Sequence, residues 1–249
     1  MALIVKPFSF ENVDFEGIDP SIHVIDIIVS DPEIQATAVS PATLDGDIFA
    51  RKRYGKRNIT ITFVVMLEDA KQRSEVIRKV CAWATNTENG EGVLRIPARE
   101  NCRINAVCTQ MPSVSSREFW EVLSITFTAY NPFFEAEEPE AFDIPTNGLL
   151  STKLTRGGDS ARWRITFDPP TSGISPTWSS RREHITLQSI PFGSVTIDSD
   201  AKTVKSYSSS IMASVALGSR FPRFVNGTNV YVRATDGAGG KIYVYARWI

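Results

Sequence analysis

Residues that often carry out chemistry are few in this chain of 249 residues, and their spacing matches no common catalytic or metal-binding pattern. Only two histidines occur, His23 and His184, and neither lies in a recognisable motif. The cysteines and histidines are not spaced as zinc ligands. A serine triad would need one of the two histidines as its base, and the chain has no Gly-x-Ser-x-Gly sequence. The sequence therefore predicts no catalytic residue, no metal, no cofactor and no enzyme.

The three cysteines are expected to be reduced thiols. Cys102 and Cys108 lie six positions apart in an expected strand, which would separate them by roughly 20 Å, beyond the reach of a disulfide. Cys81 falls on the apolar face of an expected helix. An odd count without framework spacing also favours thiols that are mostly buried.

Acidic residues leave one enzymatic alternative open. A glycoside hydrolase needs two carboxylates, which can come from distant strands. No acid stands out from its setting, because Asp198 and Asp236 are expected at turns, where carboxylates commonly accept backbone hydrogen bonds.

One strong cluster of positive charge lies within a long polar segment, residues 30–57. We expect this segment to be ordered by contact with a protein partner or with other copies of the chain. Nucleic acid, a phosphate group or plain solvent are the alternatives for such a run. The predicted contact residues are Arg51, Lys52, Arg53, Tyr54, Lys56 and Arg57.

Most of the first half of the chain alternates apolar and polar residues with a period of two, which predicts β-strands. The alternation is clean over 58–67 and 121–130 and less clean over 22–29 and 101–110. Residues 69–85 instead carry apolar side chains at helical spacing, and the Asn89-Gly90 pair is expected to end this helix.

Residues 135–148 differ in composition from both flanking regions. They contain five acidic residues together with Pro139, Pro145 and Gly148. Prolines disfavour strand pairing and like charges keep a chain extended, so we expect a linker here, with an acidic binding site as the alternative. Residues 1–134 and 149–249 are then two domains.

The second domain shows only short strands and turn signals, which predicts a β-sandwich. Alternating segments occur at 161–167, 185–187 and 195–197. Residues 230–234 and 242–248 are expected to be the two arms of a hairpin, because the glycine-rich residues 236–240 between them tolerate positive φ.

Charge and hydropathy exclude several partners. The net charge of -1 provides no overall field for nucleic acid or a membrane surface. No apolar run approaches the roughly 18 residues of a membrane span, and the N-terminus lacks the features of a signal peptide, so we expect no membrane anchor and folding in a cytoplasm.

Several segments follow one another in a familiar order. They are a basic loop with Gly46 and Gly55, the strand 57–63, the helix with Trp83, the segment 125–133, the segment 222–229, the glycine cluster and the closing residues 243–249. This order resembles the distal tail (Dit) proteins of siphophages over nearly the whole chain.

The resemblance implies a mainly β protein, with an N-terminal β-sandwich that carries one helix and a C-terminal galectin-like β-sandwich. It implies a virion protein of the tail tip, assembled in the host cytoplasm. Copies of the N-terminal domain would close a hexameric ring around a channel for DNA, which passes without sequence-specific binding. The other implied partners are the tail tube protein, the tail-associated hub protein, the tape-measure protein and a receptor-binding protein.

The alternative from another functional class is a carbohydrate-binding protein. Trp163 and Trp248 lie on alternating apolar faces and are expected in the core. Trp178, beside Ser175-Pro176 and Ser179-Ser180 in an expected loop, is the candidate for stacking on a host-surface sugar.

Overall fold

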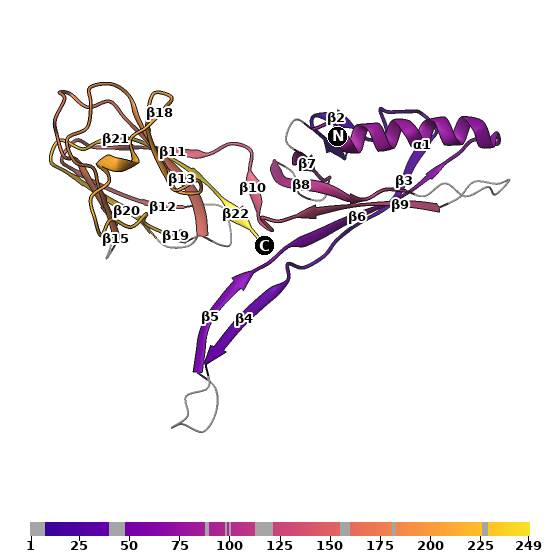
Figure 1. Ribbon diagram of the computed structural model, residues 1–249, viewed down its shortest axis with the longest axis horizontal. Coiled ribbons are helices and arrows are strands. Elements are labelled where there is room, and N and C mark those ends of the chain that lie inside the picture. The colour runs from indigo at the N-terminus through magenta and orange to yellow at the C-terminus, as the bar shows by residue number, and fades with distance from the viewer. Residues whose placement is uncertain are drawn as a thin grey trace. The chain divides into compact units, whose positions relative to one another are not determined.

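A computed structural model describes residues 8–39, 48–87, 90–97, 99, 101–112, 122–154, 160–180, 183–225 and 229–249. At positions 39, 48–52, 160, 225 and 229 it describes the backbone alone. The chain forms two compact units: unit 1 comprises Met1–Phe134 with Ile249, and unit 2 comprises Glu135–Trp248. The mainly β fold class is confirmed, since strands make up most of both units and a single α-helix lies among the described residues (Figure 1).

Unit 1 is built on one antiparallel sheet with the strand order β2-β1-β7-β8-β9-β6-β3. A separate two-stranded sheet pairs β4 with β5. The strands are β1 (Ser9–Phe10), β2 (Val13–Asp14), β3 (Ile22–Val29), β4 (Ile34–Val39), β5 (Ile48–Tyr54), β6 (Arg57–Val65), β7 (Gly92–Arg95), β8 (Cys102–Gln110) and β9 (Val122–Ala129).

The period of two seen in the sequence sets the register at the centre of this sheet. β6 and β9 pair with Ile59 opposite Phe127 and Ile61 opposite Ile125, and all four side chains are fully buried. Successive side chains of a strand alternate between faces, so these residues form one apolar face. The strands predicted at 22–29, 58–67, 101–110 and 121–130 are therefore confirmed, with small differences at their ends.

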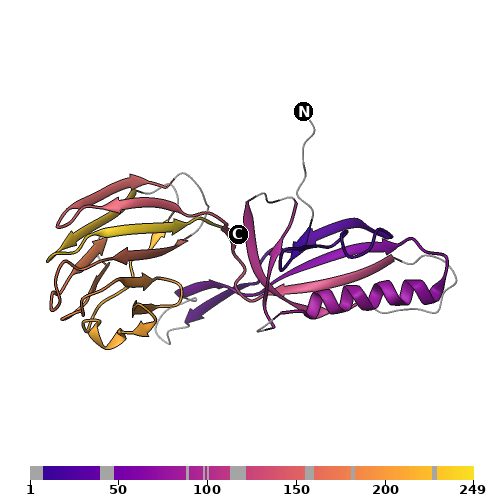
Figure 2. The same ribbon diagram turned by 90° about the horizontal axis from the view of Figure 1, so that it is seen from above.

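The helix α1 (Ala70–Thr85) covers the apolar face, and Figure 2 shows it lying along the sheet of unit 1. Asp69 caps its first turn by accepting the backbone N–H of Lys71 at 2.9 Å. Trp83 packs against an aromatic cluster formed by Phe8, Phe10, Phe15 and Phe127. The helix predicted at 69–85 is confirmed. It ends at Thr85, with Asn86 as its C-cap, and thus before the Asn89-Gly90 pair that was expected to end it; Asn89 lies outside the described residues.

Unit 2 is a sandwich of two antiparallel sheets, visible as two layers in Figure 1. One sheet has the order β11-β21-β13-β16-β17-β18, with β19 also paired to β13, and the other has the order β12-β20-β14-β15. The strands are β10 (Phe134–Ala136), β11 (Glu140–Ile144), β12 (Leu149–Lys153), β13 (Ser160–Phe167), β14 (Thr177–Ser180), β15 (Glu183–Thr186), β16 (Val195–Asp198), β17 (Thr203–Ser206), β18 (Ser209–Ser210), β19 (Phe224–Val225), β20 (Asn229–Thr235), β21 (Gly240–Tyr245) and β22 (Arg247–Trp248), with a short 3-10 helix η1 (Met212–Ser214).

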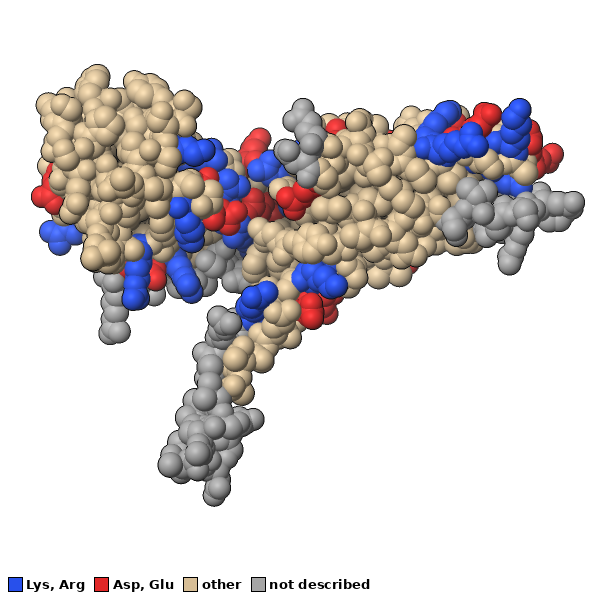
Figure 3. Space-filling model, in the orientation of Figure 1, with Lys and Arg blue, Asp and Glu red and all other residues tan. Residues whose placement is uncertain are grey.

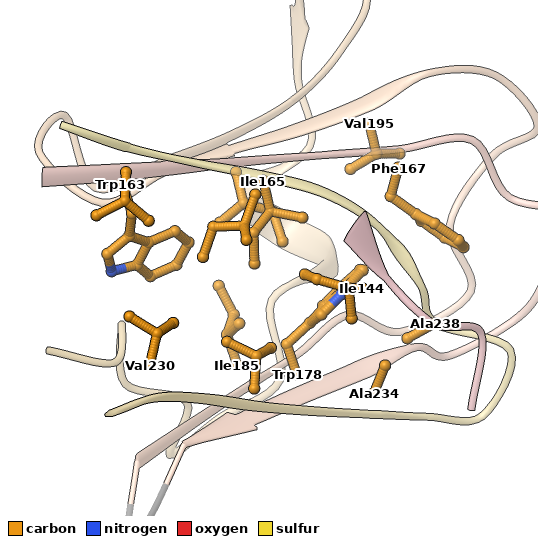
Figure 4. Close-up of a cluster of buried hydrophobic side chains, with 14 of the residues drawn as sticks. Ile144, Trp163, Ile165, Phe167, Trp178, Ile185, Val195, Val230, Ala234 and Ala238 are labelled. Atoms are coloured by element: carbon orange, nitrogen blue, oxygen red, sulfur yellow. The ribbon is translucent and has the colours of Figure 1, made fainter. Parts of the chain in front are cut away.

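The core of the sandwich lies between these sheets. Figure 4 shows Trp163, Ile165 and Phe167 from β13 pointing towards Ile185, Val230 and Trp178 of the facing sheet. Residues from β11, β16, β17, β19, β20 and β21 also belong to the cluster. The alternation predicted at 161–167, 185–187 and 195–197 is thus the inward face of the sandwich.

The hairpin predicted across residues 236–240 does not form. β20 pairs with β12 and β14, whereas β21 pairs with β11 and β13, so the two arms belong to different sheets. Ala238 between them is fully buried, and Gly240 at φ 111° approaches the carbonyl of Thr166. The glycines therefore turn the chain from one layer of the sandwich into the other.

Residues 135–148, expected to be an extended linker, contain two strands instead. β11 pairs with β21 from Glu140 opposite Val244 to Ile144 opposite Gly240. Pro139 precedes β11 and Pro145 follows it, so neither proline removes a donor from the ladder. The two prolines lie at the two ends of this strand, which is why the composition of the segment resembled that of a linker.

Candidate assembly surface

A two-stranded arm is the most unusual feature of unit 1. β4 and β5 pair only with each other, from Ile34 opposite Tyr54 to Val39 opposite Ile48. The side chains from Ile34 to Ala38 are all exposed, and 59% of the surface of Ile34 is accessible. A two-stranded hairpin gains little stability in water by itself, which distinguishes this arm from the packed strands of the main sheet.

The base of the arm is attached to the main sheet by a continuous set of backbone hydrogen bonds. Ser30 donates to the carbonyl of Asn58 at 2.9 Å, and Glu33 donates to that of Lys56 at 3.0 Å. Gly55 donates back to Glu33 at 2.6 Å. These bonds extend the β3–β6 pairing outwards, and Figure 1 shows the ribbon of the arm running on from those two strands.

The predicted contact residues separate into outward and inward side chains. Arg51 and Lys52 lie on β5, but their side chains are outside the described residues. Arg53 and Lys56 are exposed. Tyr54 is half-buried and packs edge-on against Phe133, with 5.7 Å between the ring centroids, which anchors the base of the arm.

Arg57 differs from the rest of the basic run because only 2% of its surface is exposed. It begins β6 on the core side of the sheet, where its guanidinium carbon lies 5.2 Å from the ring centroid of Phe134. Burial and then the nearby charge of Arg99 lower the pKa of Arg57, and Asp31 opposes this shift. Arg57 is therefore a buried cation and not an exposed contact.

The free edge of the main sheet adds a second surface to the arm. β3 is the last strand in the sheet order and pairs only with β6. The pairing is interrupted by a bulge between Val24 and Asp26, and Ile25 and Ile28 are more than half exposed. An exposed apolar edge strand offers unpaired backbone groups to another chain. We define the assembly surface as the arm together with this edge.

Hydroxyl side chains line the face of the sheet opposite α1. Thr60 and Thr126 lie 3.2 Å apart between their oxygens across β6 and β9, and Thr109 lies 2.9 Å from Thr128. Thr128 in turn donates to the side-chain oxygen of Asn58. This face is polar but uncharged at these positions, in contrast to the apolar face under the helix.

The sugar contact expected at Trp178 is not supported by its position. Trp178 lies on β14 with 1% of its surface exposed, and not in an exposed loop. Its indole N–H donates to the carbonyl of Gly239 at 3.1 Å, and its ring packs edge-on against Phe167. The surrounding serines misled the prediction: Ser175 precedes the strand, Ser179 lies on its other face, and Ser180 is buried beside Trp178.

Unit 2 also holds a network of ion pairs at one end of the sandwich. Glu135 on β10 accepts two hydrogen bonds from Arg247, at 2.8 and 2.5 Å, and lies 3.5 Å from Arg162. Arg162 and Arg164 both pair with Asp198, at 3.1 and 3.2 Å. Figure 3 shows charges of both signs gathered at one end of this unit, and the network links β10, β13, β16 and β22.

Asp198 accepts hydrogen bonds from two backbone N–H groups and pairs with two arginines of this network. Burial would raise its pKa, but the backbone N–H groups of Ala201 and Asp200 and the Arg162 guanidinium lower the pKa to about 2. The Asp198 carboxylate thus stabilises the turn that was expected here from the sequence and also forms the ion pairs. Its partners lie far apart in the chain, so the pairs left no local pattern in the sequence.

Neither histidine nor cysteine forms a reactive site in the described part of the chain. His23 and His184 are exposed residues on β3 and β15. Burial raises the pKa of the thiols of Cys81 and Cys108, which keeps them protonated at neutral pH. No group of three potential metal ligands occurs among the described residues, and none of their helices has the length and apolar character to span a membrane.

A sheet covered by one helix, a two-stranded arm and a β-sandwich occur together in a solved phage protein. The Dit protein (gp 19.1) of phage SPP1, described as a paradigm of the hub adsorption apparatus in phages that infect Gram-positive bacteria, has the same fold. The alignment covers 98% of this chain and 99% of that one, with a TM-score of 0.76 and 12% sequence identity. The resemblance to siphophage distal tail proteins is thereby confirmed for the fold.

A second, weaker structural neighbour belongs to a phage baseplate. The baseplate of phage P2 in its activated conformation with Ca contains a chain that is 5% identical, with 91% and 90% of the two chains aligned and a TM-score of 0.48. No family model and no curated protein matches the chain by sequence.

Proposed function

We propose that this chain is a structural protein of the tail tip of a long-tailed bacteriophage, where copies of unit 1 form a hexameric ring. The observation that carries the proposal is the likeness to the SPP1 hub protein over 98% of the chain, which includes both units. A shared fold does not by itself transfer function. The assembly surface of unit 1 supplies the independent physical reason.

The arm and the β3 edge are suited to different neighbours in a ring. A ring needs a heterologous interface, in which one surface of a copy meets a different surface of the next. The arm presents exposed strands beyond the sheet, and Ile25 and Ile28 mark an edge that another strand can extend. We infer that the arm of one copy lies against the next copy, with Arg53 and Lys56 among its contacts.

In this proposal the ring joins the tail tube to the baseplate and fibre proteins and leaves a channel for DNA. Tail tube, tape-measure, hub and receptor-binding proteins are the proposed partners, and unit 2 is the outer docking domain. Bond-making chemistry has no part in this function. The carbohydrate-binding alternative loses its only candidate residue, because Trp178 is buried.

Immunogold labelling tests the location directly. Antibodies raised against the purified chain are applied to virions whose genome encodes it and viewed by negative-stain electron microscopy. We expect gold at the tail tip. Label along the whole tube, on the capsid or nowhere on the virion would contradict the proposal, and labelling of a protein of known tail-tip position on the same particles serves as the control.

A further inference from the structure

Unit 2 contains a surface pocket of about 130 Å³ beside the ion-pair network. This is well above the roughly 10–15 Å³ that a single water needs. Its charged lining consists of four cations and one carboxylate, which is an excess of positive charge. The lining residues are Ala161, Arg162, Trp163, Ser199, Asp200, Lys202, Pro222, Arg223 and Arg247.

The acids nearby satisfy only two of the four cations. Arg247 pairs with Asp200 at 2.7 Å and with Glu135, and Arg162 pairs with Asp198 and Glu135. Lys202 and Arg223 have no ion pair within 4.0 Å in the described structure. Arg162 also keeps a buried Nε–H without an acceptor there.

The pocket is held in shape by neutral hydrogen bonds. Trp163 donates its indole N–H to the carbonyl of Pro222 at 2.7 Å and its backbone N–H to the hydroxyl of Ser199 at 2.7 Å. Ser199 returns a backbone hydrogen bond to Trp163 at 3.0 Å. Two walls of the pocket are thus fixed before any ligand binds, which lowers the entropic cost of binding.

Lys202 is positioned by the turn between β16 and β17. Its backbone has φ 53°, a conformation that asparagine or glycine adopts more easily than lysine. Asp198 holds this turn by accepting the N–H groups of Asp200 and Ala201 at 2.9 and 3.1 Å. The ammonium lies 5.0 Å from the ring centroid of Phe221, so the side chain is directed by a ring as well as by the turn.

We propose that this pocket is an oxyanion site, in which Lys202 and Arg223 bind a phosphate or carboxylate group. Such a group would supply acceptors to donors that the chain leaves without a carboxylate, and charge-assisted hydrogen bonds are the strong ones. Burial is the largest effect on the pKa of Lys202 and lowers it; Asp200 and Glu183 raise this pKa, whereas Arg223 and Arg247 lower it. The site does not depend on ring formation.

Calorimetric titration of the full chain tests the site. The probes are inorganic phosphate and acetate at matched ionic strength, followed by poly(glycerol phosphate) and polygalacturonate. Saturable binding of phosphate or acetate is the expected result. A polymer that binds more tightly than its free group identifies an anionic polymer as the source, and equal affinity per group identifies the free anion. No saturable binding of any probe would overturn the proposal.

The double variant Lys202→Gln/Arg223→Gln supplies the specific test. We expect its affinity for the bound probe to fall by about tenfold or more, since each charge-assisted contact is worth roughly that factor. Its melting temperature should fall only slightly, because neither side chain has an ion pair to lose and Lys202 loses one contact with the Phe221 ring. Lys205→Gln removes an exposed charge from the adjacent strand outside the pocket and should bind as the parent does. Equal weakening by both variants would show a general charge effect and overturn the proposal.

Discussion

The guanidinium of Arg57 is held over the ring of Phe134, with 5.2 Å between the guanidinium carbon and the ring centroid. Arg99 lies over the same ring at 4.7 Å. The Nε and Nη1 atoms of Arg57 are buried without an acceptor in the described structure. The negative face of the aromatic ring is therefore a partner of a buried cation that has no carboxylate within 4.0 Å among the described residues.

A double-mutant cycle measures the coupling free energy between Arg57 and Phe134. Phe134 is fully buried, so Phe134→Leu should lower the free energy of unfolding by about 2 kcal/mol through lost packing and lost ring contact. In the same background Arg57→Met should cost about 1 kcal/mol less than it costs alone. Urea denaturation supplies the free energies. Arg53, which is exposed, is the control: a coupling of Arg53→Met with Phe134→Leu as large as that of Arg57 would contradict the assignment.

The stability of unit 2 should fall in acid as Asp198 is protonated. Its pKa is lowered from 3.8 to about 2 in the folded chain, so its contribution is fully present above about pH 4 and is lost between about pH 4 and pH 2. The shift corresponds to about 2 kcal/mol. Asp198→Asn should remove this part of the acid dependence in thermal melts. Asp143→Asn, at an exposed ion pair with Lys241, should leave it unchanged.

Substitution of Trp178 should lower the stability of unit 2 and should not act through sugar binding, because its side chain is buried. Trp178→Phe removes the indole hydrogen bond to the buried carbonyl of Gly239 and should cost about 1–3 kcal/mol in free energy of unfolding. Trp178→Ala should cost about 3–5 kcal/mol. Phe192→Ala, at a residue with 69% of its surface exposed, should change it by less than about 0.5 kcal/mol. A destabilisation by Trp178→Ala no greater than this would contradict the burial described here.

Gly240→Ala tests the crossing between the two sheets of unit 2. An added Cβ would collide with the carbonyl of Thr166, and the residue has φ 111°. Gly173 also has positive φ, 80°, but open space around its Cα. Gly173→Ala should therefore cost about 1 kcal/mol of stability, whereas Gly240→Ala should cost at least about 3 kcal/mol. Similar melting temperatures for the two variants would count against the close approach of β21 to β13.

Local periodicity was sufficient to predict the elements whose two faces differ. β6 and β9 bury one face under α1, so their alternation is clean, and α1 shows its buried stripe at helical spacing. The period does not encode which strand pairs with which. The residues 236–240 carry the same glycines whether the chain reverses within a sheet or crosses between sheets, so the hairpin prediction was wrong.

The candidate sites were harder to predict for a related reason. Arg57 belongs to a basic run, and only the fold places it on the buried side of β6. Trp178 sits among serines, which hid a short strand whose alternate residues are buried. The cationic pocket joins residues from four separate regions around 162, 200, 223 and 247, and such a juxtaposition leaves no local signal in a single sequence.

Native mass spectrometry of the purified chain tests the ring most directly, with a variant in which residues 37–51 are replaced by Asn-Gly. Ala36 and Lys52 face each other across the arm, so a two-residue turn can join them and leave its base intact. We expect the parent chain at about 166 kDa, six times 27.6 kDa, and the variant as a folded monomer. A parent chain that stays at 27.6 kDa at high concentration would contradict the ring, and a variant that still forms the same ring would contradict the role of the arm.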